Sequence, residues 1–267
     1  MAWGQIRAGI GGWTFEPWRG VFYPKDLKHA DELAYAASHL TAIEINGTYY
    51  SSFKPESWAK WRAATPAGFK FAVKASRFCT NRKVLGEMGE SMERFLSQGL
   101  VELGDRLGPL LWQFMGTKKF DPDDFEAFLK LLPAAQDGLA LTHVVEPRHS
   151  SFATPEFVAL ARKYNVAICL ADHFQYPLIA DVTGPLVYVR LQTGSDEIET
   201  AYGPADLDLW AGRLKTYAKG STPADLPLTA PSSPATEEPR DVYAFVIHEG
   251  KVRAPAAAMA IIERVAG

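Results

Sequence analysis

The sequence is poor in cysteine and contains no long apolar run. Only Cys79 and Cys169 occur among 267 residues, and they lie far apart without the paired spacing of a zinc site. This pattern indicates two buried thiols in a reducing compartment. No apolar stretch approaches the roughly 20 residues that span a bilayer, and the first residues show no signal-peptide pattern. We therefore expect a cytoplasmic protein with no membrane partner.

An excess of positive charge is also missing. Lysine and arginine number 28 against 31 aspartate and glutamate residues, which gives a formal net charge of −3. Charge therefore does not suggest tight binding to nucleic acid, and a small-molecule ligand is the expected partner. The glycine-rich run from Gly9 to Trp13 lacks the dinucleotide fingerprint, so no cofactor is assigned. Nothing in the sequence indicates an oligomeric state.

Short apolar runs alternate with longer segments of helical period through the chain. This alternation is typical of repeated strand–helix units around a parallel sheet, and the length suits one barrel domain. We therefore predict a single (β/α)8 barrel of the TIM type over residues 1–267. Its eight strands are expected at Ile6–Ile10, Ala42–Asn46, Lys70–Lys74, Pro109–Gln113, Leu139–Glu146, Ala167–Asp172, Leu186–Gln192 and Val242–His248.

Helices are expected between these strands, with Asp, Ser or Thr near several of their starts as N-cap candidates. The clearest helical segments are Asp31–His39, Ser91–Leu103, Asp123–Leu132, Thr154–Tyr164 and Leu207–Ala218. A stretch rich in Pro, Ser, Ala and Thr at about residues 220–240 is expected to form a mobile surface loop before the last strand.

Polar side chains gather at the predicted strand ends. Along Ala42–Asn46 the period of two directs both isoleucines toward the helices and directs Glu44 and Asn46 into the barrel. The same alternation points Lys74 inward at the end of the next strand. Repeated over the remaining strands, it adds the following inward residues: Gln113, Glu146, Arg148, Asp172, Arg190, Gln192 and His248.

This inward set is balanced in charge, since three carboxylates face three cations. Ionised groups in a partly dry cavity are expected to pair, so a salt-bridge network that plugs the barrel is one interpretation. Such networks add little stability over apolar packing, and barrels keep their active sites at this end, so a functional site is favoured. Two further histidines, His143 and His173, are expected to point away from this set.

Aromatic residues follow the first two predicted strands. They are Trp13, Trp18, Phe22, Tyr23, Tyr49, Tyr50 and Phe53. Trp13 and Tyr49 are candidates for contact with a ligand, although packing of long loops onto the barrel is the commoner role of such residues.

Several longer motifs follow one another along the chain: Ile10 to Trp13, Trp18 to Pro24, Glu44 to Tyr50, Phe71 to Lys74, Gly108 to Phe114, Glu146 to His149 and Val189 to Leu191. Together they resemble the domain-of-unknown-function-72 family, also called YecE-like. The resemblance covers nearly the whole chain and implies a TIM-type barrel without an assigned activity. It also implies that the family's recurrent polar positions form one site, namely Glu44, Asn46, Tyr49, Lys74, Gln113, Glu146, Arg148 and Arg190.

The sequence departs from that family's pattern at three places. Asn81 stands where the family commonly has histidine after the third strand, and Gln192 replaces a histidine on the seventh. His248 and Glu249 stand where the family often has two asparagines. A mechanism that requires the usual histidines is therefore expected here only if His248 substitutes for them.

The favoured function is proton transfer on a small polar, anionic substrate, as in an isomerase, epimerase or lyase. Glu44 or Glu146 would be the base and Lys74 the electrophile, all three catalytic. Phosphate or carboxylate groups would be clamped by the two arginines. The substrate-binding candidates are Trp13, Asn46, Tyr49, Gln113, Arg148, Asp172, Arg190, Gln192 and His248.

Three other interpretations stay open. Lys74 would form a Schiff base if burial or a neighbouring cation lowered its pKa, although nearby carboxylates oppose this. Metal-dependent hydrolysis, including phosphodiester cleavage, would use Glu44, Glu146, Asp172 and His248 as ligands, but neighbouring cations disfavour a divalent metal. The third interpretation is a non-catalytic protein whose rim binds a sugar, nucleotide or polar peptide.

Overall fold

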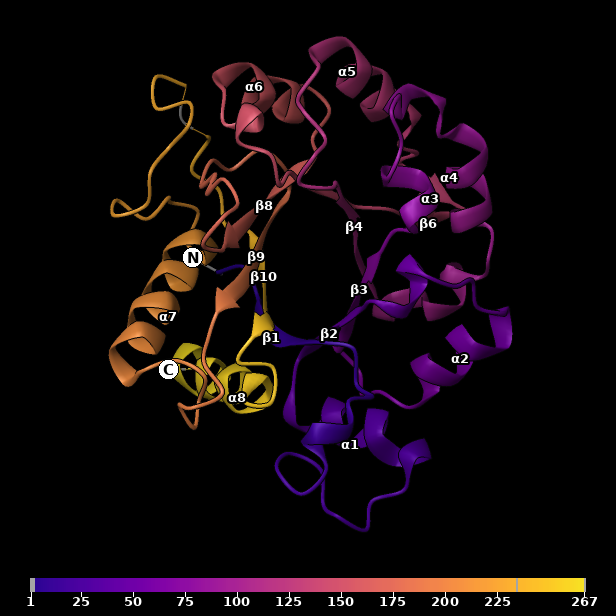
Figure 1. Ribbon diagram of the computed structural model, residues 1–267, viewed down its shortest axis with the longest axis vertical. Helices are drawn as coiled ribbons and strands as arrows, with labels where there is room; N and C mark the ends of the chain where they lie inside the picture. The colour runs from indigo at the N-terminus through magenta and orange to yellow at the C-terminus, as the bar shows by residue number, and fades with distance from the viewer. Residues whose placement is uncertain (1–2, 234, 267) are drawn as a thin grey trace.

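Eight parallel strands pair edge to edge and close on themselves in the computed structural model, which describes residues 3–233 and 235–266. Around the barrel their order is β1-β10-β9-β8-β7-β4-β3-β2, and the helices surround them (Figure 1). The predicted (β/α)8 class is confirmed. The barrel strands are β1 (Ile6–Gly11), β2 (Ala42–Ile45), β3 (Lys70–Lys74), β4 (Leu107–Gln113), β7 (His143–Glu146), β8 (Ala167–Asp172), β9 (Leu186–Thr193) and β10 (Asp241–Glu249).

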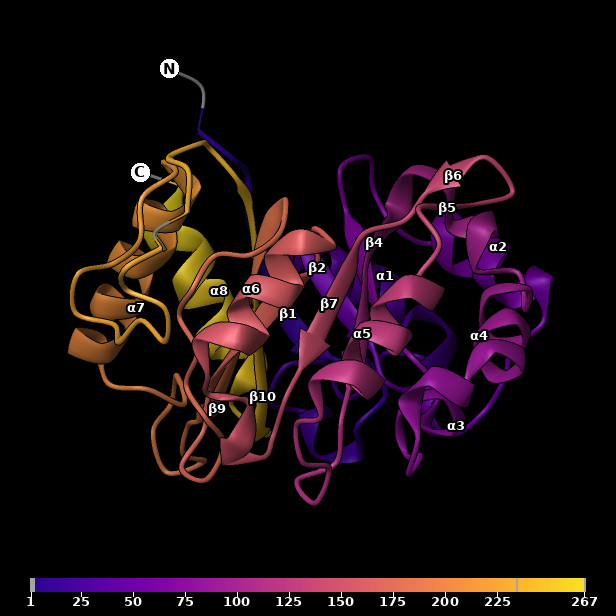
Figure 2. The ribbon, with the colours of Figure 1, turned by 90° about the horizontal axis from the view of Figure 1, so that it is seen from above.

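The helices form the outer layer, and two views at right angles both place α7 beside α8 (Figures 1 and 2). The α-helices are α1 (Glu32–His39), α2 (Pro55–Ala63), α3 (Arg77–Thr80), α4 (Gly89–Leu96), α5 (Pro122–Leu131), α6 (Pro155–Lys163), α7 (Pro204–Ala218) and α8 (Ala254–Val265). Short 3-10 helices span Glu16–Trp18, His29–Asp31, Gly47–Tyr49, Leu85–Glu87, Leu100–Arg106 and Ser150–Phe152. As expected for N-caps, the side chains of Asp121 and Thr154 accept backbone hydrogen bonds at the starts of α5 and α6.

Two predicted elements are shorter in the structure. The run Leu139–Glu146 is not one strand, because Leu139–Ala140 forms β6 in an antiparallel pair with β5 (Ala135–Gln136). The turn between them has positive φ at Asp137 and Gly138. The helix expected over Ser91–Leu103 ends at Leu96, because Gly99, with a φ of 105°, breaks the helical path before the 3-10 helix begins.

The core has two layers, as the alternation of strand side chains requires. The outer layer lies between the strands and the helices and includes Ile43, Ile45 and Val73. The inner layer fills the barrel with Ala42, Ala72, Leu111, Val144, Ala167, Cys169, Leu186, Tyr188, Tyr243 and Phe245. Polar residues that follow these inner residues along each strand therefore lie above the inner core layer, at the carboxyl ends of the strands.

The segment between α7 and β10 has no helix or strand among its described residues, yet it is tied to the barrel. The carboxylate of Asp181 accepts hydrogen bonds from the backbone N–H groups of Thr229 and Ala230, at 2.6 and 3.0 Å. Arg240 donates to backbone oxygens of this segment, including that of Gly220 at 3.1 Å. The sequence predicted a mobile loop, whereas the structure shows an anchored one. Within the described ranges, no helix is both long and apolar enough to cross a bilayer.

Candidate active site

Arg190 lies between two carboxylates at the top of the barrel interior. Its Nη1 donates to Glu146 Oε1 and Oε2 at 3.0 and 2.8 Å, and its Nη2 donates to Glu44 Oε1 at 2.9 Å. Glu44 and Glu146 are fully buried, and Arg190 is 3% exposed. The alternation along β2, β7 and β9 carries all three side chains to the inner face, since Ala42, Val144 and Tyr188 precede them in the inner core layer. The strands thus bring a buried cation onto two buried anions.

Both carboxylates are fully occupied by neighbouring donors. Tyr188 donates its hydroxyl to Glu44 Oε2 at 2.5 Å, and Gln113 Nε2 donates to Glu146 Oε2 at 2.8 Å. Arg148 Nε donates to Glu146 Oε1 at 2.9 Å. Each of the four carboxylate oxygens therefore accepts at least one hydrogen bond from within the barrel. Burial of ion pairs is tolerated when such partners satisfy the remaining lone pairs.

These contacts set the ionisation of the buried groups. Burial alone would raise the pKa of Glu146, but Arg190, Arg148, the Gln113 hydrogen bond and Lys74 outweigh it and lower the pKa to about 2. Burial would lower the pKa of Arg190, yet Glu146 and Glu44 raise it above its usual value. Glu146 is consequently an anion at neutral pH and holds no proton to donate.

A cavity of about 590 Å³ opens directly above this cluster, and we call it the mouth cavity. It is lined by Gly11, Asn46, Tyr49, Tyr50, Lys74, Gln113, Arg148, Arg190, Gln192, Ile247, His248, Glu249 and Lys251. Four of these residues are cations and one is a carboxylate, while the two buried glutamates lie beneath the cavity and do not line it. The surface that a ligand meets is therefore predominantly positive and suits an anion.

Lys74 lines the mouth cavity and has a lowered pKa. Its Nζ lies 4.2 Å from the centroid of the Tyr49 ring, and no carboxylate of the described residues lies within 4.0 Å of it. Burial lowers the pKa of Lys74 to about 8, with Arg190 and Arg148 adding to the effect and the two glutamates opposing it. An amine with this pKa exchanges protons near neutral pH, which an ordinary lysine does not.

Three polar atoms at the mouth cavity are buried and have no hydrogen-bond partner within residues 3–233 and 235–266. They are Asn46 Oδ1, Gln192 Oε1 and Arg190 Nε. An unpartnered buried polar atom costs about 1–3 kcal/mol, so such atoms are usually satisfied by a ligand or by water. Residues that line the cavity therefore hold two unused acceptor atoms and one unused donor atom.

The rim on the β8 and β10 side is built from aromatic rings. The rings of His173 and Tyr176 stack with centroids 3.7 Å apart, and Arg148 lies 4.5 Å from the centroid of Tyr176. His248 packs edge-on against His173 at 5.4 Å. Burial, His248 and Arg148 lower the pKa of His173. His173, which the sequence predicted to point away from the site, does not line the mouth cavity, although its ring contacts His248, which does.

The predicted orientation of Asp172 is wrong, whereas His248 lines the mouth cavity as predicted but by another route. Leu170 and Val246 belong to the outer core layer, so the alternation that continues to Asp172 and His248 leads outward, not inward. The carboxylate of Asp172 accepts a hydrogen bond from Thr193 Oγ1 at 2.7 Å and does not line the mouth cavity. His248 reaches the cavity only because β10 shifts register after Val246 and His248 adopts a φ of 82°.

Most of the aromatic residues near the first two strands pack against the fold. Trp13, expected to contact a ligand, instead packs edge-on against Trp61 of α2 at 5.2 Å. It does not line the mouth cavity, whereas Tyr49 and Tyr50 do. The alternative of loop packing also describes the other rings in this set, since Trp18, Phe22 and Tyr23 are buried and Phe53 packs on Trp61.

Four residues were weighed as metal ligands, and their side chains do not gather into one group. Glu44 and Glu146 are held by Arg190, Asp172 contacts Thr193, and His248 pairs with Glu249 at 3.1 Å. Within the described part of the chain, no group of three or more His, Cys, Asp or Glu residues is arranged to hold a metal ion.

Sequence reasoning did not select several residues that the structure adds to the site. Tyr188 precedes Arg190 by two positions on the same strand, so the alternation alone was sufficient to find it. Tyr50, Tyr176 and Lys251 lie in loops, where no periodic signal indicates which way a side chain points. These residues enter the site only through the path of each loop.

Comparison with known proteins identifies the family of this chain but does not assign a reaction to it. The model of the family described as "Protein of unknown function DUF72" matches residues 7–267. No curated protein matches the sequence. Among solved structures, a DUF72 family protein from Thermotoga maritima is 21% identical with a TM-score of 0.69, and the match covers 97% of each chain. One from Enterococcus faecalis is 15% identical with a TM-score of 0.68, covering 99% of this chain and 98% of the other.

The fold is also similar, more distantly, to that of a named enzyme. A solved D-psicose 3-epimerase is 13% identical with a TM-score of 0.52, and the match covers 97% of this chain and 95% of that one. At this identity the likeness is one of fold alone. The family match spans almost the entire barrel, including every strand that contributes to the mouth cavity, and the chain therefore belongs to the DUF72 family.

Proposed function

We propose that this protein is an enzyme that transfers a proton on a small anionic substrate bound in the mouth cavity, in a reaction of the isomerase, epimerase or lyase type. The observation that carries the proposal is the state of Lys74. It faces a cavity of about 590 Å³ without a carboxylate partner among the described residues, and its pKa is lowered to about 8. An unpaired amine that faces a cavity and has a lowered pKa is typical of an active site. A structural ion-pair network does not require such a group.

The geometry favours roles that differ from those expected from the sequence. Glu44 and Glu146 were candidates for the base, but all their oxygens are engaged and neither lines the cavity. We therefore assign proton transfer to Lys74. The two glutamates instead hold Arg190 in place at the floor of the cavity.

Substrate recognition is assigned to the remaining polar groups of the cavity. Arg148 uses Nε on Glu146 and presents the rest of its guanidinium to the cavity, where it suits a carboxylate or phosphate. Asn46 Oδ1 and Gln192 Oε1 have no partner among the described residues and would accept hydrogen bonds from substrate hydroxyl groups. The substrate class is therefore a hydroxylated carboxylate or phosphate ester.

Solvent exchange tests this proposal directly. Sugar phosphates and hydroxy acids would be screened by thermal shift, and each compound that stabilises the protein would be incubated with it in D2O. Proton abstraction from carbon predicts deuterium incorporation that NMR detects. Lys74→Met is expected to slow incorporation at least about 100-fold, the usual contribution of a general acid or base. Arg148→Lys is expected chiefly to weaken binding, because lysine lacks the planar guanidinium that donates two parallel hydrogen bonds to a carboxylate or phosphate.

Lys60→Met is the matched control for loss of a lysine, since Lys60 lies exposed on α2, away from the mouth cavity. It is expected to exchange at the wild-type rate. Binding of several compounds without any deuterium incorporation would contradict the proposal and favour a non-catalytic binding protein. Equal incorporation by Lys74→Met and the wild type would contradict the role of Lys74.

A covalent route is the second candidate, favoured by the same unpaired amine. The Lys74 nitrogen would attack a substrate carbonyl carbon and lose water to form an imine, which requires the neutral amine that a pKa of about 8 supplies. Borohydride would reduce the imine to a stable secondary amine. A mass increase on the Lys74 peptide with a keto acid or ketose phosphate would support this route, and its absence with every bound carbonyl compound would leave non-covalent proton transfer.

A further inference from the structure

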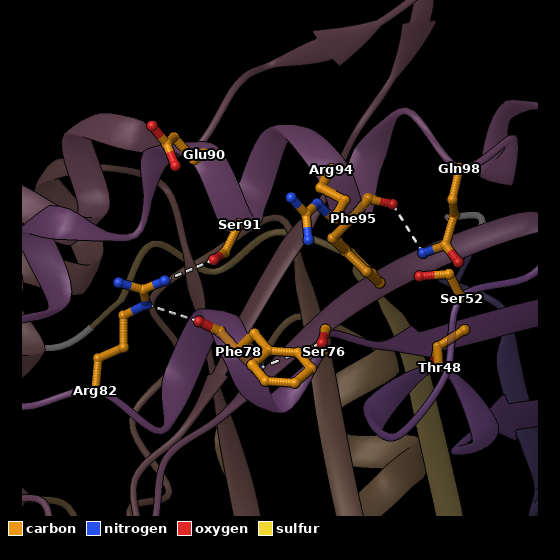
Figure 3. Close-up of a pocket in the computed structure, with 10 residues that line it drawn as sticks. All are labelled: Thr48, Ser52, Ser76, Phe78, Arg82, Glu90, Ser91, Arg94, Phe95 and Gln98. Carbon is orange, nitrogen blue, oxygen red and sulfur yellow. Dashed lines mark hydrogen bonds between the residues drawn. The ribbon is translucent and has the colours of Figure 1, made fainter.

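A second cavity lies beside the mouth cavity, between α4 and the loops that follow β2 and β3. Its volume is about 330 Å³, and none of its lining residues also lines the mouth cavity. Figure 3 shows the side chains that surround it: Thr48, Ser52, Ser76, Phe78, Arg82, Glu90, Ser91, Arg94, Phe95 and Gln98. Two guanidinium groups and several hydroxyls therefore face one space.

Arg82 is held in a fixed position at this cavity. Its Nε donates to the backbone oxygen of Phe78, and its Nη2 donates to Ser91 Oγ, both at 2.7 Å (Figure 3). These bonds join α3 to α4 and leave Nη1 of Arg82 without a partner among the described residues. A guanidinium fixed in advance loses less side-chain entropy when it binds an anion.

Arg94 supplies the second cation. It lies one turn before Gln98 on the same wall of the cavity, and in Figure 3 its guanidinium lies between Arg82 and Gln98. It forms no ion pair within 4.0 Å in the described part of the chain, and neither does its neighbour Glu90. The Glu90 carboxylate therefore forms no ion pair with either arginine of the cavity.

The other walls suit an organic ligand more than a bare ion. Phe95 is buried and Phe78 is 60% exposed, so together they offer apolar surface beside the arginines. Ser52 and Ser76 place hydroxyl groups on the opposite side of the space (Figure 3). Aromatic surface next to paired guanidinium groups matches a molecule with an anionic end and an apolar body.

We infer that this cavity is a second binding site, separate from the mouth cavity, for a small organic anion with a carboxylate or phosphate group. The two sites have no lining residue in common but are built in part on neighbouring residues of the chain. Thr48 lines the second cavity and donates its hydroxyl to the backbone oxygen of Lys74 at 2.6 Å, while the next residue, Tyr49, lines the mouth cavity. An anion bound here would therefore contact the loop that follows Lys74 and the loop that contains Tyr49.

Phenyl phosphate is a suitable probe, because it joins a dianion to one aromatic ring. Isothermal titration of the full-length protein is expected to give binding that Arg94→Ala weakens at least about tenfold, the usual size of a lost charged hydrogen bond. Arg94 is exposed, so its replacement is not expected to disturb folding. Arg94→Lys keeps the positive charge but lacks the bidentate guanidinium. Its affinity for phenyl phosphate is expected to lie between those of Arg94→Ala and the wild type.

Two further variants separate this site from the mouth cavity and from general charge effects. Lys74→Met removes a cation of the mouth cavity, and Lys60→Ala removes an exposed lysine of α2. In both variants the phenyl phosphate binding that depends on Arg94 is expected to stay within about twofold of the wild type, since neither residue lines the second cavity. Equal affinity in Arg94→Ala and the wild type would overturn the inference. So would an equal loss in Lys74→Met, because the probe would then occupy the mouth cavity.

Discussion

The guanidinium of Arg190 lies 2.9 Å from a carboxylate oxygen of Glu44, although 146 positions separate the two residues in the sequence. A second carboxylate, that of Glu146, accepts from the other nitrogen of the same guanidinium at 2.8 Å. One cation thus pairs with two anions from different strands in the barrel interior, and Arg148 supplies the second cation on Glu146. Removal of that cation would leave like charges facing each other without solvent.

Arg190→Met is therefore expected to destabilise the protein by about 3–5 kcal/mol, the usual cost of leaving a buried charge without its partner. Urea unfolding followed by circular dichroism measures this difference. The matched control is Arg213→Met, which breaks the more exposed pair with Asp225 and is expected to cost much less. Similar unfolding midpoints for the two variants would show that the buried cluster is not a stability determinant.

The acid stability of the protein should depend on Glu146. The folded-state pKa of this carboxyl, about 2, lies below the ordinary value of 4.5. The unfolded chain therefore binds its proton first, and the stabilisation present above about pH 4.5 declines as the pH falls toward 2. Glu146→Gln removes this titration and should reduce the slope of unfolding free energy against pH in that window. An unchanged slope would argue that other carboxyls control acid unfolding.

Lys74 should titrate well below an ordinary lysine. Because its pKa is lowered to about 8, the neutral amine is expected to react with an acylating reagent with a midpoint near that pH. Peptide mass spectrometry measures the extent of modification at each pH, and the peptide containing Lys60 serves as an internal comparison. A midpoint for Lys74 near the reference value of about 10.4 would remove the basis for its proposed role in proton transfer.

The backbone of His248 should be strained. This residue adopts a φ of 82° where β10 shifts register, a conformation that costs a residue with a side chain about 1–3 kcal/mol. His248→Gly is expected to raise the unfolding free energy by up to about 1 kcal/mol, because glycine accepts positive φ but loses more chain entropy on folding.

The comparison variant is His248→Ala, which removes the imidazole and keeps the side-chain carbon that opposes positive φ. It should lack the gain in stability. If the glycine and alanine variants unfold at the same denaturant concentration, the strain is absent. If both lose binding of a ligand in the mouth cavity, the imidazole takes part in that site.

The alternation of residues along the strands predicted most of the site. Glu44, Lys74 and Arg190 follow inward residues at a spacing of two, and the structure places them together at the barrel mouth. The same reasoning placed Asp172 wrongly, because β8 is buried on both faces and its apolar sequence does not show which face is inward. His248 does line the mouth cavity as predicted, but it does so through a change of register in β10 that the alternation did not include.

The sequence by itself determined the barrel, the positions of its strands and the kinds of side chain that end them, because strand periodicity is a local property. Only the tertiary structure decided how those side chains pair. Arg190 engages both glutamates, so Lys74 is left facing the mouth cavity without a carboxylate partner among the described residues. That outcome depends on the distances between strands on opposite sides of a closed barrel, and these distances follow from strand tilt and register, which no local sequence pattern records.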